Sequence, residues 1–228
     1  QKQTRDWGSA DDAGVVYTLL STGADWTDSS APARFMLGDK ILVPSNRDAV
    51  LGSFNLTLNA KEASGKLLTV EKNGTHPAWG GVAVSYLAPL DDIKAYSIPD
   101  LSIDKKVYLM QPDGSSFNLV DTNKLKVGDR VRIMLTIKSG RDMDYVAVTD
   151  ERAGCMEPAE QLPGMQAQES VWYYREPRTS ATNLFIGFLP KGTVVLTYDC
   201  YIMEEGTFVS GIATAQSQFS PLMTAHST

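Results

Sequence analysis

The stretch TVVLTYDCYIM at residues 193–203 decides the fold. Its first set of alternate positions carries Val194, Leu196, Tyr198, Cys200 and Ile202. Its second set carries Val195, Thr197, Asp199, Tyr201 and Met203. A period of two residues, with the more apolar set on one side, predicts a long β-strand that buries one face.

Turn-forming residues lie at both ends of this strand. Pro190-Lys191-Gly192 precedes it, and Glu204-Glu205-Gly206 leads to a second run, Phe208 to Phe219, which we expect to return antiparallel if the turn is tight. Two strands alone are marginal in water, so the upstream chain must supply a second sheet to cover their apolar face.

The residues before the stretch contain further strand patterns, separated by turns rich in Gly, Asp and Pro. Alternation or strand-forming residues occur at Leu101–Met110, Phe117–Val120, Val131–Ile137 and Met143–Thr149. With the closing pair these make about seven strands, the number typical of an antiparallel sandwich. The fold class is therefore predicted to be mainly β, with a Greek-key β-sandwich at the C-terminal end.

The N-terminal third has a different pattern. Ser9 is a candidate N-cap of an α-helix, an apolar stripe follows, and Gly23 is where a left-handed residue would end the helix. A smaller β-sheet region follows the helix, and Ala88 to Asp100 is the expected linker to the sandwich. The short strand-like runs are Phe35–Leu37, Lys40–Val43, Gly52–Leu58, Lys66–Glu71 and Val82–Leu87. The stripe consists of Ala13, Val16, Tyr17 and Leu20, and we expect it to be buried against another element.

Several blocks, in the same order, resemble the C-terminal macroglobulin-type domain of bacterial alpha-2-macroglobulin-like proteins. The blocks are residues 125–131 (LKVGDRV), 141–146 (RDMDYV), 173–176 (YYRE), 181–183 (ATN), 189–193 (LPKGT), 206–208 (GTF) and 213–217 (ATAQS). They are spread across most of residues 99–228, and it is their order that makes the resemblance specific.

The resemblance implies an organisation. Residues 1–26 would be the last helix of a thioester-type helical domain, 27–98 the second half of a CUB-like β domain with open strand edges, and 99–228 the macroglobulin-like sandwich. It also implies a function: a non-catalytic C-terminal segment of an exported periplasmic or cell-surface protease inhibitor that encloses proteases by conformational collapse. The expected partners are the remaining domains of a longer chain and the target proteases, with no cofactor.

The aromatic run Trp172-Tyr173-Tyr174-Arg175 is the candidate interface with the thioester-type domain. Four large side chains in a row on a strand cannot all point inward, so some aromatic surface is expected outside. By resemblance a tyrosine of this region covers the thioester in the resting state, and Tyr174, or else Tyr173, is the matching residue. The alternative is that the run only seals the edge of the sandwich.

Composition and motifs argue against several other functions. Among 228 residues, 43% are hydrophobic, and 21 basic residues face 27 acidic ones with a net charge of −6, without a basic patch for nucleic acid. No apolar run approaches the ~20 residues of a membrane span, so no membrane insertion is expected.

The sequence predicts no catalytic residue and no metal site, because no recognised motif occurs. His76 is expected in a loop and His226 in a frayed tail. Cys200 is expected on a buried face, and Cys155 in a loop where a disulfide to Cys200 stays open.

Acidic residues gather around one strand, at Asp142, Asp144, Asp150 and Glu151. We expect a solvated rim with salt bridges to Arg141 and Arg152 rather than a calcium site. Two alternatives to the inhibitor remain: an exported adhesion or glycan-binding sandwich, and, third, an enzyme built on Cys155 or His226.

Overall fold

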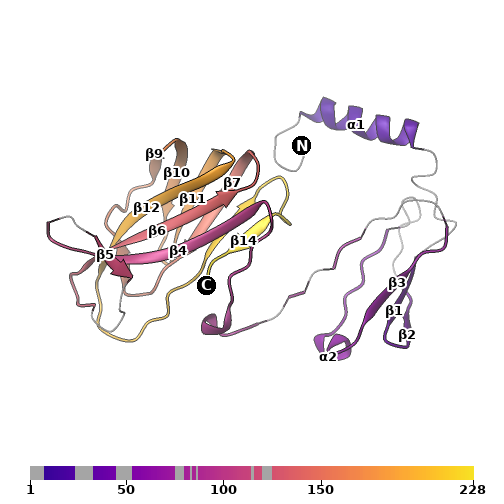
Figure 1. The fold of residues 1–228 in the computed structure, drawn as a ribbon, viewed down its shortest axis with the longest axis horizontal. Coiled ribbons are helices and arrows are strands. Elements are labelled where there is room, and N and C mark those ends of the chain that lie inside the picture. The colour runs from indigo at the N-terminus through magenta and orange to yellow at the C-terminus, as the bar shows by residue number, and fades with distance from the viewer. Residues whose placement is uncertain are drawn as a thin grey trace. The chain divides into compact units, whose positions relative to one another are not determined.

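The sandwich predicted from the closing stretch is present. In the computed structural model the chain divides into two compact units, one containing residues 8–85 and the other residues 86–228. The structure describes residues 8–23, 33–44, 53–74, 80–82, 84–85, 87–113, 116–119 and 125–228. Figure 1 traces the chain through both units.

Two antiparallel sheets face each other in the second unit. The five-stranded sheet has the order β5-β4-β6-β12-β8, with β4 Leu101–Met110, β5 Ser116–Leu119, β6 Arg130–Ser139, β8 Met156–Pro158 and β12 Gly192–Ile202. The six-stranded sheet has the order β14-β13-β7-β11-β10-β9, with β7 Met143–Glu151, β9 Gly164–Gln168, β10 Val171–Pro177, β11 Ala181–Leu189, β13 Ala213–Ser217 and β14 Thr224–His226. All their pairings are antiparallel, which confirms the fold class.

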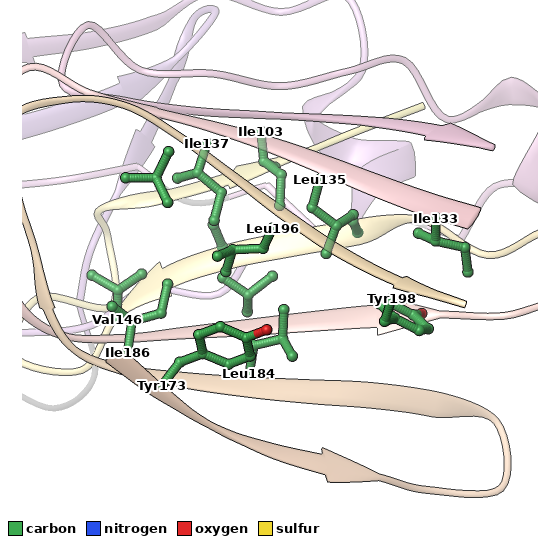
Figure 2. Packing of buried hydrophobic residues seen from close by; sticks show 14 of the residues in the cluster. Ile103, Ile133, Leu135, Ile137, Val146, Tyr173, Leu184, Ile186, Leu196 and Tyr198 are labelled. Atoms are coloured by element: carbon green, nitrogen blue, oxygen red, sulfur yellow. The ribbon is translucent and has the colours of Figure 1, made fainter. Parts of the chain in front are cut away.

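The core lies between the two sheets. Along β12 the buried positions are those of the first predicted set, and Leu196 stands opposite Leu135 of the neighbouring β6. Figure 2 shows Ile103, Leu135 and Leu196 of one sheet directed toward Val146, Leu184 and Ile186 of the other. Each fully buried aliphatic side chain contributes roughly 1.5–3 kcal/mol relative to exposure, so this cluster dominates the stability of the unit.

Three expectations about the sandwich are wrong. More strands are present than the roughly seven predicted, because β8 to β11 lie in a region where the sequence indicated only an aromatic run. The run Phe208–Phe219 does not return beside β12: its only strand, β13, pairs with β7 in the opposite sheet. The turn after β12 is therefore a crossing between sheets rather than a tight hairpin.

The C-terminal end is ordered by pairing, not frayed. His226 belongs to β14, which pairs with β13, and its backbone exchanges two hydrogen bonds of 2.9 Å with Tyr96 of the linker. The Tyr96 and His226 rings stack at 5.9 Å. Earlier in the linker, Leu90–Asp92 forms a short 3-10 helix, η1.

The first unit is smaller. It contains α1 (Ser9–Thr22) and the short α2 (Ala60–Ala63), together with a three-stranded antiparallel sheet of order β2-β1-β3. The strands are β1 Arg34–Leu37, β2 Lys40–Leu42 and β3 Leu68–Glu71. The runs predicted at 35–37, 40–43 and 66–71 are confirmed. The predicted strands at 52–58 and 82–87 are not strands in their described residues.

The helix differs from expectation in both caps and in burial. Gly8, not Ser9, is the N-cap residue, and Gly23 has an extended rather than a left-handed backbone. None of the α1 side chains is buried, and Tyr17 of the predicted stripe is 74% exposed. The stripe is present in the sequence, but no element of the described residues covers it.

Candidate functional site

The predicted aromatic run forms most of β10, and strand alternation divides it in two. Tyr173 is 1% exposed and Arg175 is also buried, whereas Trp172 is 66% and Tyr174 is 40% exposed. Because successive side chains of a strand point to opposite faces, only Trp172 and Tyr174 lie on the outer face of the six-stranded sheet.

Neighbouring strands add apolar side chains to this outer face. Tyr174 stands opposite Phe185 of β11 on one side and Met165 of β9 on the other. Together these residues line a groove of about 540 Å³. We define the aromatic groove by its large side chains: Tyr145, Met165, Trp172, Tyr174, Phe185 and Phe188.

Tyr145 of β7 also lies on the outer face, because it is two residues from Ala147, which lines the groove as well. The register between β7 and β11 is the same on both sides of Tyr145, with Ile186 opposite Val146 and Phe188 opposite Asp144, and Tyr145 has a φ of 54°. The Tyr145 ring contacts Phe219 edge to face at 5.5 Å, and its carbonyl accepts a 2.9 Å hydrogen bond from the backbone N–H of Gln218.

Tyr173 and Arg175, the two inward-pointing residues of the run, stabilise β10 from inside the sandwich. The Tyr173 hydroxyl donates to Gln166 Oε1 at 3.1 Å, and burial raises the pKa of Tyr173. The Arg175 guanidinium forms an ion pair with the Glu160 carboxylate. These two residues therefore support β10 from inside and do not reach the groove surface.

The acidic cluster is a solvated rim only in part, since Asp142 and Glu151 are exposed but Asp150 is not. Asp150 is fully buried, with Lys105 Nζ at 2.6 Å and a 2.5 Å hydrogen bond from the Tyr198 hydroxyl. Burial raises the pKa of the Asp150 carboxyl, although the charge of Lys105 opposes that shift. Asp150 thus links the six-stranded sheet to two strands of the five-stranded sheet.

The expected salt bridges of the cluster are also wrong. Arg141 pairs with Asp100, and Arg152 donates to Thr182 Oγ1 at 2.5 Å and to the Thr179 carbonyl at 3.2 Å. Asp150 instead pairs with Lys105 of the facing sheet, whose Nζ also donates to the carbonyls of Glu151 at 2.6 Å and Gly211 at 2.9 Å.

Neither thiol is poised to act as a nucleophile. Cys155 and Cys200 are both buried and free of a disulfide. Burial raises the pKa of Cys200 to about 12 and raises that of Cys155 as well, so neither thiol is activated. His76 lies outside the described residues.

In the described part of the chain, no three side chains of His, Cys, Asp or Glu are placed to hold a metal ion. None of its helices combines the length and the apolar character that crossing a bilayer requires.

The aromatic groove is therefore the most distinctive feature of the described surface, and its chemistry is burial of apolar area. Tyr, Trp, Phe and Met are enriched in protein interfaces, and contiguous exposed apolar surface marks interaction sites. Only the β10 part of the groove was predicted from the sequence. A signal for β11 was available in Leu184-Phe185-Ile186, where apolar residues occupy both faces of one strand.

Comparison with known proteins adds a family and a fold. The family described as "Bacterial Alpha-2-macroglobulin MG10 domain" matches residues 101–221. No curated protein sequence matches the chain.

Two solved structures are similar to this chain over nearly its whole length. The structure of Escherichia coli alpha-2-macroglobulin activated by porcine elastase has a TM-score of 0.50 and 15% sequence identity, covering 98% of this chain and 20% of that chain. For Salmonella alpha-2-macroglobulin reacted with methylamine the TM-score is 0.49 at 16% identity, covering 98% of this chain and 14% of that chain. The chain therefore spans only a small part of the length of either protein.

Proposed function

The chain belongs to the bacterial alpha-2-macroglobulin family through its MG10 domain at residues 101–221, and from this we propose that it is the non-catalytic C-terminal segment of a protease inhibitor. In this proposal a protease cleaves elsewhere in the longer protein, whose domains then collapse around the protease. Trapping of this kind depends on the relative stability of two packed arrangements, not on bond-making by the segment.

The proposed role of the sandwich is that of a rigid body with one docking face. Its core is continuous and its sheets are linked through Asp150, so the outer face holds a fixed shape. The observation that carries the proposal is the aromatic groove. An apolar surface of this size, in a chain that covers 20% of the length of a structural relative, suits contact with another domain of the same protein.

We propose that the groove contacts the thioester-type helical domain, with Tyr174 as the residue that covers the thioester in the resting state. Trp172 lies beside it on the same face. Tyr173 and Arg175 act indirectly, by fixing β10 from the inside. Residues 1–26 and 27–98 are proposed to complete a helical and a CUB-like domain, respectively, with strands contributed by other parts of the longer chain.

The proposed partners are the remaining domains and the target proteases, in an exported protein of the periplasm or cell surface. The glycan-binding alternative has less support. Sugar recognition needs polar groups beside aromatic rings, whereas the groove lining is mainly aromatic and aliphatic, with Ser170 and Gln218 as its polar members besides the two tyrosines.

The test uses the longer protein and porcine elastase, the protease that activates the E. coli relative. After mixing, we expect a shift in native gel mobility, and elastase that cleaves a small peptide substrate but resists a bulky protein inhibitor. Full sensitivity to the bulky inhibitor, at complete cleavage of the longer protein, would contradict trapping.

Matched variants test the role of the groove. Tyr174→Ser should weaken the resting state, so that the thioester reacts with methylamine faster before any cleavage. Tyr201→Ser is the control, because Tyr201 is also 40% exposed but lies on β12 in the other sheet. Equal methylamine reaction rates for Tyr174→Ser and the unmodified protein would exclude Tyr174 from this role.

A further inference from the structure

The outer edge of β12 is the second feature of the sandwich that calls for an explanation. β12 pairs with β6 along its whole length, but on its other side β8 covers only Cys200 to Ile202. Alternate residues of a strand direct both backbone polar groups to the same side. The N–H and C=O groups of Thr193, Val195 and Thr197 therefore face away from β6 without a partner strand.

Side chains take the place of that strand. The Gln168 amide makes two hydrogen bonds with Thr197: its Oε1 accepts from the backbone N–H at 2.7 Å, and its Nε2 donates to the carbonyl at 2.7 Å. Glu169 Oε2 accepts from the backbone N–H of Val195 at 3.3 Å. One amide side chain thus reproduces the paired donor and acceptor of a strand residue.

The turn that supplies these side chains is unusual. Gln168 stands opposite Val171, so Glu169 and Ser170 form the two-residue loop between β9 and β10. Glu169 has a φ of 52°, a left-handed conformation that favours glycine. A non-glycine residue held in this conformation points to a role for its side chain, and the contact with Val195 provides one.

The sequence of the edge shows why it needs cover. Residues 193–198, TVVLTY, are rich in β-branched and aromatic residues and contain no charge, proline or glycine. Segments of this kind pair readily with identical segments when their backbone is exposed. An antiparallel pair of two such edges has Val195 opposite Val195 and satisfies the outward groups of both copies.

We propose that Gln168 and Glu169 guard the edge of β12 against pairing with β12 of a second copy of this chain. The excluded partner is a second copy of this chain, because the exposed edge of β12 is complementary to itself. The proposal concerns the sandwich alone and holds whether or not the longer protein traps proteases.

The experiment uses the 228-residue chain carrying both Gln168→Ala and Glu169→Gly. We expect its mass by light scattering to double at concentrations where the unmodified chain is a monomer. Glu169→Gln, which keeps an acceptor oxygen, should remain a monomer. Adding Val195→Lys to the double variant places like charges opposite each other in the paired edges and should restore the monomer.

Two results would overturn the proposal. One is a folded double variant that stays monomeric at all concentrations, and the other is a dimer that Val195→Lys does not dissociate. If the double variant does not fold, the single variant Glu169→Gly is tested instead, by amide exchange. Loss of one hydrogen bond should then speed amide exchange at Val195 by roughly fivefold, and unchanged exchange would refute the guard.

Discussion

Both units contain antiparallel β-strands, but only in the sandwich do these strands enclose a large core. The sandwich contains strands of nine to eleven residues, and their apolar faces meet a second sheet. The unit at residues 8–85 has strands of three or four residues, and its described buried side chains are Leu37 and Leu42. The difference shows that alternation in sequence is not sufficient for a core: each apolar face needs a second layer to cover it.

The helix α1 makes the same point. Its stripe satisfies the helical period, yet Val16, Tyr17 and Leu20 are all more than half exposed. Most of the stability of a helix in a protein comes from packing of its apolar face rather than from its propensity. We therefore expect residues 8–85 to contribute little to the stability of the chain by themselves.

The largest effect should come from the buried charge pair of the sandwich. Asp150→Ala leaves the Lys105 ammonium buried without its partner and should lower the free energy of unfolding by about 3–5 kcal/mol in urea denaturation. Asp104→Ala is the control, because the Asp104 carboxylate is exposed and 3.7 Å from Lys106 Nζ, and it should change stability by less than about 1 kcal/mol. Similar losses for the two variants would show that Asp150 is not a link between the sheets.

Core truncation compares the two units directly. Leu135→Ala creates a cavity between the sheets and should cost about 3 kcal/mol in the main unfolding transition. Leu42→Ala should shift that transition by less than about 0.5 kcal/mol, since Leu42 belongs to the other unit. If Leu42→Ala shifted it as much as Leu135→Ala, the two units would unfold as one.

Replacing a glycine by alanine should change stability in opposite directions in the two units. A Cβ at Gly211 would lie 2.2 Å from Glu151 Cβ, so Gly211→Ala forces the crossing segment away from β7 and should cost about 2 kcal/mol. A Cβ at Gly14 in α1 would have nothing within 4 Å, and Gly14→Ala should stabilise the helix by up to about 1 kcal/mol. Denaturation and helical circular dichroism measure these effects, and a stabilising Gly211→Ala would contradict the packing of the crossing.

The smallest expected effect is the acid sensitivity of Asp199. Burial raises the pKa of this carboxyl, but hydrogen bonds and charge from Arg132 and Arg130 outweigh burial and hold the pKa below its ordinary value of 3.8. The stabilising contribution is therefore present above pH 3.8 and is lost as the pH falls through the lower, folded-state pKa.

The measurement compares the unmodified chain with Asp199→Asn. The difference in their free energies of unfolding should shrink when the pH is lowered below 3.8. The pKa of Asp150 shifts in the opposite direction, but Asp150 is present in both proteins and so does not affect the difference. A difference that stays constant with pH would show that the arginines do not stabilise the folded carboxylate.

Local sequence patterns predicted the long strands of the five-stranded sheet well, but they missed β8 to β11. Sequence patterns identified β4, β6 and β12 with nearly correct ends, because one face of each strand is more apolar than the other. The destination of β13 could not be predicted in this way. Ten residues, 203–212, separate it from β12, and pairing with β7 depends on contacts distant in sequence.

The candidate site was predicted only in part for the same reason. Trp172 and Tyr174 lie on one strand, and their exposure follows from alternation. Tyr145, Met165 and Phe188 come from three other strands, and only the strand order of the sheet brings them to the same face. Lys105 likewise reaches Asp150 from the opposite sheet, a contact that no spacing in the sequence indicates.

Native-state hydrogen exchange of the 228-residue chain is the most direct test of the contrast between its two units. Amides of Leu135 in β6 and Leu184 in β11 should exchange only through global unfolding, with protection equal to the full unfolding free energy of about 5–15 kcal/mol. Amides of Leu19 and Leu20 in α1 should exchange at nearly the rate of an unstructured peptide. Protection of the α1 amides equal to that of Leu135 would contradict the claim that only the sandwich is stable by itself.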